Sequence, residues 1–567
     1  MQVLGLSALA HDTAAALLGD AGFLSAIEES KLTRSRSSSG IPREAIRFCL
    51  ERASINWRDV HAIAVASRPW RSWARRSWMR ARYLPLSPGT SGYYESNFLG
   101  DMARELNNLR ILRLLSRDSR VPVLAFEHHL CHAASAFYAS PFDRAVVLTF
   151  DEQGDGLAGT VVIGENGKLR IERSVAFPHS LAWVYSQVTE LLGFRPREHE
   201  HRTQWLSPTA EPAFADVFLK MLRRAPNPYP RLDSRYFRSG FAGQLAFPDK
   251  FYRQTGISPS QRREIDSKTS GALAASLQHA CEIILAELAR SLHKRTSISN
   301  LCLAGGLFLN PLLVSAIEAS SSFENVFVQP AAGNEGTALG AAFLARAHSG
   351  APAIANALPH VYLGPRYTND EIKAIFDNCK ASYGWLSSDS QKIEETLELL
   401  LAGKIVGWFE GAAQFGPRAL GNRSLLASPW APYVRENLND YVKHHEPFRP
   451  FAFSVSEEDA AKYFVFTLPA RFMTNMSAVR PEHREKFANY LLPRDRVRLH
   501  VVAPGVNPLL TALLRRFGQK VPAPVLLNTS LNLFGEPLVL SPRHAFRSYF
   551  CSGVDALVIG SFLLVKC

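Results

Sequence analysis

Twice in the middle of the chain, a short apolar strand runs into a turn that contains glycine and then into a helix. Residues 301–303 lead into Gly305 and Gly306, and residues 326–329 lead into the turn 332–336. Glycines let a backbone approach a nucleotide, and the helix N-terminus adds a positive dipole, but ordinary tight turns need the same residues. Strands that alternate with helices in this way predict an α/β architecture.

The predicted strands and helices fall into two parts of the chain. Residues 349–365 are rich in Ala, Pro and Gly and follow a predicted helix, which is typical of a domain boundary. The 567 residues exceed the usual size of one domain, roughly 100 to 200 residues. We therefore expect an N-terminal domain over 1–350, a linker over 351–370 and a C-terminal domain over 371–567.

Charge and cysteine content narrow the class of protein. The chain carries 64 Lys and Arg against 51 Asp and Glu, a net charge of +13 that suits either nucleic acid or small anionic phosphates as partners. Seven cysteines without a C-x-x-C pair favour reduced thiols. The N-terminus lacks the basic start of a signal peptide, and we find no apolar stretch of about 18 residues. We therefore expect a cytoplasmic protein without a membrane span.

The sharpest local signal is the run His128-His129-Leu130-Cys131-His132, directly after a predicted strand. His128 and His132 are four residues apart and share one face of a helix, which is the geometry that a metal needs from a helical pair. Asp151 follows another predicted strand and begins an acidic loop, so its carboxylate would complete the site. These ligands suit iron, manganese or zinc. The alternative is two capped surface histidines and an acidic turn.

A second cluster of candidate binding residues lies in the C-terminal part. Residues 414–424 combine two arginines with glycine and proline, and Lys443 and Arg449 follow. Planar guanidinium groups match phosphate oxygens in pairs, so these cations would converge on one anion. A solvated basic face is the alternative, but the residues around Arg418 are apolar and form turns, which a solvated charge does not require. Asn528 and its neighbours offer groups that bind an uncharged amide or a phosphate.

Six motifs in this order resemble the NodU/CmcH/TobZ-type O-carbamoyltransferases, and the resemblance runs over nearly the whole chain. Each motif alone is moderately specific, whereas six in register are highly specific. The motifs are His11-Asp12, His128-His129-Leu130-Cys131-His132, Leu303-Ala304-Gly305-Gly306, Gly416-Pro417-Arg418-Ala419-Leu420-Gly421-Asn422-Arg423-Ser424, Phe448-Arg449-Pro450-Phe451-Ala452 and Leu527-Asn528-Thr529-Ser530.

The resemblance implies a two-domain α/β fold, with an N-terminal ASKHA, actin-like domain and a C-terminal YrdC-like domain. It also implies an ATP-dependent carbamoyltransferase. The C-terminal domain would convert carbamoyl phosphate and ATP, with Mg²⁺, to carbamoyl-adenylate. The N-terminal domain would pass the carbamoyl group to a hydroxyl of a small metabolite, such as an antibiotic, another secondary metabolite or a sugar, next to Fe²⁺ or a similar metal.

The resemblance further assigns a role to each matching residue. His11 would be the acid/base for the acceptor hydroxyl, a task that imidazole suits near neutral pH. The metal would be held by His128, His132, Asp151 and, more weakly, Asn334; the nucleotide by Gly305, Gly306, Asn310 and Gly333; and carbamoyl phosphate by Arg418, Lys443, Arg449 and Asn528.

Several positions depart from the family pattern. Asn334 and Glu335 stand where an Asp usually supplies a fourth metal ligand, and an amide is the weaker ligand. An impaired homologue and another user of carbamoyl-adenylate, such as a tRNA modifier, are therefore alternatives. Three other departures are single residues: Trp205 stands where the family has Gly, Gln414 where it has Glu and His445 where it has Arg. In the stretch 492–498, only Arg498 corresponds to the family pattern.

Arginine and tryptophan alternate over residues 68–82, which is the composition of a nucleic-acid patch. However, Trp70, Trp73 and Trp78 fall on one broad face of a helix. We expect this face to point into the core or the acceptor pocket, with the arginines solvated. Nucleic acid is then not an expected partner, and a homodimer is an open alternative for the assembly.

Overall fold

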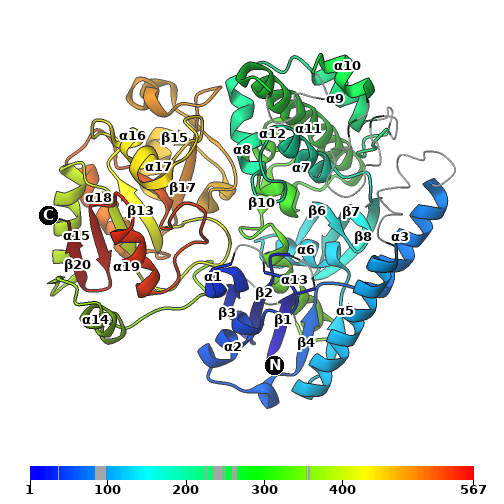
Figure 1. The fold of residues 1–567 in the computed structure, drawn as a ribbon, viewed down its shortest axis with the longest axis horizontal. Helices are drawn as coiled ribbons and strands as arrows, with labels where there is room; N and C mark the ends of the chain where they lie inside the picture. Colours follow the sequence, from blue (N-terminus) through cyan, green and yellow to red (C-terminus); the bar gives the residue numbers. More distant parts are fainter. Residues whose placement is uncertain are drawn as a thin grey trace. The chain divides into compact units, whose positions relative to one another are not determined.

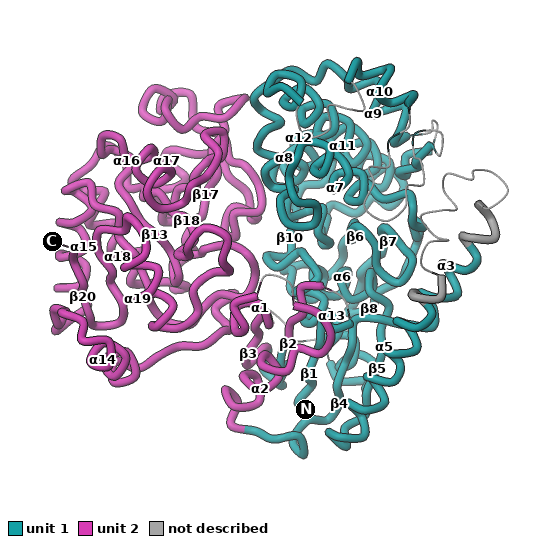
Figure 2. Tube along the Cα trace, in the orientation of Figure 1, with its two compact units in different colours: residues 1–10, 16–22, 55–357 teal, residues 11–15, 23–54, 358–567 magenta. Residues whose placement is uncertain are grey.

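The computed structural model describes residues 1–9, 11–35, 38–83, 98–223, 227–233, 236, 247, 249–257, 265–352, 354 and 358–566. Figure 1 labels their helices and strands, and Figure 2 colours the two compact units that they form: the first comprises residues 1–10, 16–22 and 55–357, and the second 11–15, 23–54 and 358–567. The last change of unit falls between residues 357 and 358, inside the expected linker 351–370. The sequence analysis does not predict that 11–15 and 23–54 group with the C-terminal residues.

Two five-stranded sheets repeat one strand order. The orders are β3-β2-β1-β4-β5 and β8-β7-β6-β9-β10, and in each sheet the last three strands are parallel. This duplication is typical of actin-like folds, so the expected α/β architecture with an actin-like N-terminal domain is confirmed. The strands are β1 (Val3–Ser7), β2 (Ala14–Leu18), β3 (Phe23–Glu28), β4 (Ala62–Val65), β5 (Val123–Ala125), β6 (Arg144–Gly154), β7 (Leu157–Glu165), β8 (Lys168–Ala176), β9 (Asn300–Ala304) and β10 (Asn325–Val328).

Helices α6 (His128–Phe137) and α13 (Thr337–His348) lie between these sheets. α6 packs on β6 and β9, α13 packs on β1 and β4, and the two helices pack on each other. Their close approach requires glycine at position 340, because an added Cβ would lie 1.8 Å from the Cys131 carbonyl oxygen. The helix with the histidine run is therefore held rigidly from both sides.

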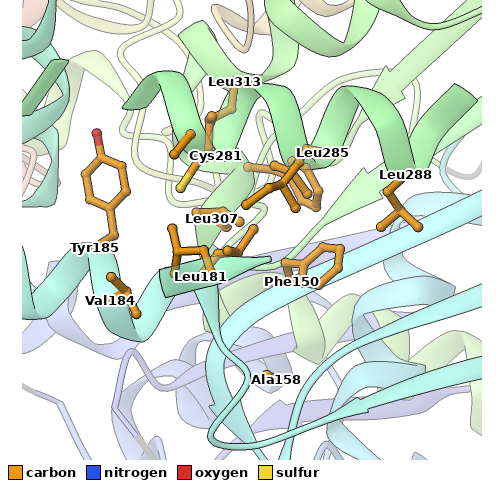
Figure 3. Close-up of a cluster of buried hydrophobic side chains, with 14 of the residues drawn as sticks. Phe150, Ala158, Leu181, Val184, Tyr185, Cys281, Leu285, Leu288, Leu307 and Leu313 are labelled. Atoms are coloured by element: carbon orange, nitrogen blue, oxygen red, sulfur yellow. The ribbon is translucent and has the colours of Figure 1, made fainter. Parts of the chain in front are cut away.

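The core of the first unit lies beside β6. Figure 3 shows Phe150, Leu181, Leu285 and Leu313 packed together, and this cluster fixes the part of β6 next to Asp151. Helix α11 (Ser267–Thr296) is apolar and long enough to cross a membrane by length and composition, contrary to the sequence analysis. Because 72% of its apolar window is buried, we interpret it as a core helix. The other helices of this unit are α3 (Pro69–Tyr83), α5 (Phe98–Ser119), α7 (Leu181–Leu191), α8 (Glu200–Leu206), α9 (Ala215–Leu222), α10 (Asp249–Thr255) and α12 (Pro311–Ser320).

The second unit is built on one mixed sheet of ten strands, in the order β11-β20-β19-β12-β13-β18-β14-β17-β16-β15. Its strands are β11 (Gly384–Trp385), β12 (Val406–Phe409), β13 (Arg423–Ala427), β14 (Ala452–Ser456), β15 (Phe464–Val465), β16 (Ser477–Val479), β17 (Arg496–Val502), β18 (Leu526–Ser530), β19 (Ala556–Ile559) and β20 (Phe562–Val565). Its helices are α1 (Glu29–Thr33), α2 (Arg43–Arg52), α14 (Asn369–Asn378), α15 (Asp389–Leu401), α16 (Val434–Leu438), α17 (Glu457–Tyr463), α18 (Pro508–Gly518) and α19 (Pro542–Phe550). Two α/β units agree with the predicted two-domain class.

Candidate functional site

His128 and His132 lie one turn apart on α6, next to Asp151 of β6. The Nε2 atom of His132 is 3.2 Å from Asp151 Oδ2, that of His128 is 3.6 Å from the same oxygen, and the two Nε2 atoms are 3.1 Å apart. All three residues are buried. The structure thus brings these residues together, and the alternative of two surface histidines is wrong.

The cluster has the dimensions of a metal site. Bonds of about 2.1 Å to a metal separate neighbouring ligand atoms by about 3.0 Å in an octahedron and about 3.4 Å in a tetrahedron, close to the separations in the cluster. A hydrogen bond to the Ala66 backbone orients the His128 ring, as is usual for a metal-ligating histidine. The residues therefore fit a single divalent ion that keeps open positions for other ligands.

The protonation states of Asp151 and His132 suit a metal. Burial would lower the pKa of His128, but its hydrogen bond with Asp151 and the nearby carboxylates raise it, so a metal would have to displace a proton from that ring. Burial alone would raise the pKa of Asp151, but hydrogen bonds from His128 and His132 outweigh it and hold the pKa well below its usual value. Burial lowers the pKa of His132, which Asp151 opposes only in part. An ionised carboxylate beside a neutral imidazole is the form in which these residues bind metals.

His129, between the two candidate ligands in sequence, has a structural role. Its Nδ1 lies 3.0 Å from Thr149 Oγ1 and its Nε2 lies 3.2 Å from the Leu157 carbonyl oxygen, so both ring nitrogens are engaged within the protein. Burial holds the pKa of His129 well below its usual value, which keeps the ring neutral. His129 therefore ties α6 to β6 and β7.

Helix α3 does not bury its tryptophans in the core. Arg71 and Arg75 each lie 3.1 Å from the buried carboxylate of Glu127, the residue before α6. A buried charge of this kind must be paired, and Arg71 and Arg75 pair with it while 50% and 31% of their own side chains stay exposed. The tryptophans are exposed by 48%, 42% and 59% (Trp70, Trp73 and Trp78). The expectation that they point into the core is wrong, whereas a place at the acceptor pocket stays a prediction.

The turn after β9 lies against the candidate metal cluster. Gly305 has a φ of 99°, which favours glycine, and an added Cβ at Gly306 would lie 3.0 Å from Asp151 Oδ1. Asn310 caps α12 by accepting from the Leu312 and Leu313 amides, and its Nδ2 donates to Gln278 Oε1. The side chain of Asn310 is thus already used for structure.

Three other predicted residues have less defined surroundings. Gly333 precedes the turn Asn334–Gly336, in which Asn334 and Glu335 are buried. Within the described part of the chain, Glu335 does not join the cluster of His128, His132 and Asp151. His11 belongs to the second unit, and its half-exposed ring lies 2.7 Å, Nδ1 to Oδ2, from Asp12.

The predicted anion-binding residues gather on the sheet of the second unit. Ala452 of β14 pairs with Arg498 of β17 on one side and with Asn528 of β18 on the other. Burial and the neighbouring cations Arg418 and Arg449 hold the pKa of Arg498 well below its usual value. Three guanidinium groups so close together repel one another, and Glu446 Oε2, 3.6 Å from Arg449 Nη1, offsets part of this positive charge. The sequence analysis did not assign Arg498 to the site, although Arg498 is the one residue of the stretch 492–498 that corresponds to the family pattern.

Lys443 lies in the same part of the second unit, and Ser530 and Asn532 hold its side chain. The Nζ atom donates to the Ser530 carbonyl oxygen at 2.8 Å, to Ser530 Oγ at 3.2 Å and to Asn532 Oδ1 at 2.6 Å. Ser530 is two residues from Asn528 on β18, so their side chains share one face of the sheet. Lys443 therefore adds a buried positive charge to that face.

The loop that carries Arg418 is anchored to the segment 23–54. Lys31 Nζ lies 2.8 Å from Glu28 Oε1 and donates to the Gln414 and Gly416 carbonyl oxygens, both at 2.8 Å. Glu28 Oε1 accepts from the Gly416 amide at 2.7 Å. These contacts explain why 23–54 belongs to the second unit: a buried ion pair and loop carbonyls satisfy one another there.

We predict that Lys31→Met lowers the free energy of unfolding by about 3–5 kcal/mol, because it leaves Glu28 as an unpaired buried charge. Urea denaturation followed by tryptophan fluorescence would measure the change. The control is Lys462→Met, which removes an exposed partner of Asp459 and should have little effect. Equal stability of the Lys31→Met variant and the unmodified protein would contradict the anchoring role.

The departures from the family pattern lie in ordinary packing. Trp205 is buried on α8, and His445 stacks on Phe451 with ring centroids 6.3 Å apart. Gln414 is fully buried, and its Nε2 donates to the Arg418 carbonyl oxygen at 3.1 Å. Gln414 therefore helps to hold the loop of Arg418.

The chain matches both the N-terminal and the C-terminal part of one protein family. Residues 2–343 match the description "Carbamoyltransferase N-terminus", and residues 397–566 match "Carbamoyltransferase C-terminus". The chain is 32% identical to the uncharacterized protein sll1178 of Synechocystis sp., covering 100% of this chain and 96% of the relative. It is 31% identical to nodulation protein NolNO of Sinorhizobium fredii, covering 98% of this chain and 79% of that protein.

Among solved structures, component A of Acidaminococcus fermentans (R)-2-hydroxyglutaryl-CoA dehydratase matches with a TM-score of 0.34 and 13% identity. The match covers 62% of this chain and 99% of that one. A likeness of this size says nothing about function.

Proposed function

The chain belongs to the carbamoyltransferase family, and on this premise we propose how it transfers a carbamoyl group. The donor is carbamoyl phosphate, which the enzyme activates with ATP and Mg²⁺ as carbamoyl-adenylate. Water first hydrolyses carbamoyl phosphate to carbamate and phosphate, and a carbamate oxygen then attacks the α-phosphorus of ATP, which breaks the bond to the β-phosphate and releases pyrophosphate. The acceptor is a hydroxyl group of a small metabolite, of the antibiotic, secondary-metabolite or sugar type.

The observation that carries the proposal is the group of cations on the sheet of the second unit. Arg418, Arg449 and Arg498 lie close enough to affect one another's charge, and Lys443 is buried nearby. Guanidinium groups bind phosphate oxygens in a bidentate manner and would neutralise the donor's phosphate. Asn528 on the same sheet would hold the uncharged end of the donor.

The first unit would supply the metal and the nucleotide contacts. His128, His132 and Asp151 would hold Fe²⁺ or a similar ion, with Asn334 as a weaker ligand. Such an ion polarises a carbonyl group as a Lewis acid. Gly305, Gly306 and Gly333 would let the nucleotide approach the backbone. For Asn310 we favour the capping role.

His11 would take the proton of the acceptor hydroxyl. The Asp12 carboxylate, 2.7 Å from His11 Nδ1, would orient the ring and stabilise its protonated form. A carbonyl-adenylate has a good leaving group, so orienting the alcohol and removing its proton are the main tasks left to the protein.

The donor half of the proposal is tested without an acceptor. The purified protein is incubated with carbamoyl phosphate, ATP and Mg²⁺, and mass spectrometry looks for carbamoyl-adenylate while a coupled assay follows pyrophosphate. Both products are expected. Their absence from a folded, metal-loaded protein would instead favour an impaired homologue or another carbamoyl donor.

We predict that His11→Ala leaves formation of carbamoyl-adenylate unchanged and slows transfer to an acceptor alcohol about 100- to 10,000-fold, the usual contribution of a general base. The two steps are measured separately by mass spectrometry, with the unmodified protein as the reference. Transfer at the unmodified rate would show that another group takes the proton.

We also propose that the enzyme is cytoplasmic and that nucleic acid is not its partner. It is supported by the pairing of Arg71 and Arg75 with Glu127, which engages these charges within the protein. A homodimer remains our proposal for the assembly, and sedimentation would test it.

A further inference from the structure

Asp155 stands in the turn that joins β6 to β7, directly after the strand that carries Asp151. Its backbone has a φ of 48°, in the left-handed region that residues other than glycine adopt at a cost. The residue is also exposed by only 6%. Residues in such a conformation persist where their surroundings fix them, and they gather at functional sites. The contacts of its carboxylate therefore have to hold Asp155 in place.

The carboxylate of Asp155 accepts three hydrogen bonds. Oδ2 accepts from the amide of Arg68 at 3.0 Å and from the amide of His128 at 2.9 Å, and Oδ1 accepts from Ser67 Oγ at 3.0 Å. Ser67 and Arg68 lie between β4 and α3, whereas His128 begins α6. Within the described part of the chain, Asp155 does not join the candidate metal cluster. It therefore ties α6 to the segment after β4 and is not itself a ligand.

The first of these contacts fixes the backbone of His128. The first amide groups of a helix have no partner within the helix, and the side chain of Glu127 makes no capping hydrogen bond to the amides of α6. Asp155 supplies the missing acceptor from another segment, and a negative charge at a helix N-terminus is stabilising. The point at which His128 leaves the backbone is thus set by Asp155.

The other two contacts affect the ring of His128. The backbone of Ala66 forms a hydrogen bond with this ring, and Ala66 directly precedes the two residues that Asp155 holds. Gly154, on the other side of the same turn, lies against the ring, because an added Cβ there would be 2.0 Å from His128 Cδ2. The ring is therefore enclosed by segments whose positions depend on Asp155.

We propose that Asp155 is the positioning residue of the candidate metal site and that it aims His128 Nε2 at the ion. It does so by fixing the backbone of His128 and the segment whose backbone orients the ring. The inference rests on the metal site of the proposed function. Groups that orient metal-ligating histidines contribute about 10- to 100-fold to metal affinity although they do not touch the metal.

The test measures binding of Co²⁺ to the full-length protein, because the visible absorption of this ion reports the geometry of its ligands. The variant Asp155→Gly removes the carboxylate, and glycine adopts the left-handed backbone without strain. We expect it to bind Co²⁺ about 10- to 100-fold more weakly and with a changed absorption spectrum.

Asp155→Asn is the conservative variant. Its amide oxygen can accept from both backbone amides, and its NH₂ group can donate to Ser67 Oγ. We expect Asp155→Asn to keep the Co²⁺ affinity and the spectrum of the unmodified protein. The matched control is Asp495→Gly, since Asp495 also has a positive φ of 53° and pairs with Arg484, but in the second unit. This control should leave Co²⁺ binding unchanged.

The outcomes separate the inference from the metal site itself. Unchanged Co²⁺ affinity in a folded Asp155→Gly variant would overturn the inference alone, and equal losses in Asp155→Gly and Asp155→Asn would show that charge acts and not position. If circular dichroism shows that Asp155→Gly is unfolded, Ser67→Ala replaces it. This variant removes one of the three hydrogen bonds and should weaken binding about 2- to 10-fold; an unchanged affinity would overturn the inference. Failure of the unmodified protein to bind Co²⁺ would overturn the metal site and the inference together.

Discussion

Replacing Arg418 with alanine is expected to lower the rate of carbamoyl-adenylate formation by about 100- to 1000-fold, the usual loss when one preorganised donor is removed from a site where charge develops. Arg418 is one of three guanidinium groups that converge in the second unit. Its removal relieves repulsion in the unliganded protein, so the fold should persist while the phosphate loses a partner. Adenylate formation is followed by mass spectrometry and pyrophosphate release.

The control for this prediction is Arg516→Ala, which removes an exposed arginine paired with Glu394 in the same unit. This control changes the net charge by the same amount as Arg418→Ala and should leave the rate of carbamoyl-adenylate formation unchanged. If Arg418→Ala formed the adenylate as fast as the control, Arg418 would not belong to the donor site. Equal losses in both variants would indicate an effect of overall charge.

Replacing His132 with alanine should abolish stoichiometric metal binding. Even the loss of an outer partner of a metal ligand weakens binding about 10- to 100-fold, and His132 is one of only three side chains in the cluster. We expect an affinity loss of at least about 100-fold, measured by elemental analysis after dialysis against a defined iron concentration.

His129→Gln is the matched control, because His129 is also a buried imidazole of α6 but both its nitrogens contact protein atoms. This variant should retain its metal if circular dichroism shows that it is folded. Retained metal in His132→Ala would refute the ligand assignment, and loss of metal in His129→Gln alone would transfer that role to His129.

The parts of the site that the sequence predicts are those set by local geometry. The spacing of His128 and His132 places them on one helical face whatever the helix packs against. Asp151 joins them as predicted, but it lies within β6 and not in a loop after the strand. The sequence analysis expected Arg418 and Arg449 to bind one anion, and it rejected a solvated basic face because the residues around Arg418 are apolar and form turns. The strand and helix pattern likewise predicted the α/β class.

What the sequence did not predict depends on contacts between distant residues. The spacing of the tryptophans in α3 gave the correct helix, but these side chains are exposed and not part of the core. The resemblance assigned Asn310 to the nucleotide, and this stays a prediction; its role as the cap of α12 depends on contacts that the assignment did not include. The grouping of Lys31 with Gly416 depends on an ion pair that no local pattern contains.

The discontinuous second unit has a consequence for synthesis and for protein engineering. On the ribosome, β3 and α1 emerge early, but the loop that accepts the hydrogen bonds of Lys31 emerges only after residues 55–357 have been made. The second unit therefore cannot complete its fold while the first is being translated. A gene cut at residue 358 would yield a C-terminal fragment without its anchoring ion pair and an N-terminal fragment with Glu28 and Lys31 left uncovered. Carrying residues 23–54 over to the C-terminal fragment would restore the ion pair but would remove β3 from the sheet in which it pairs with β2.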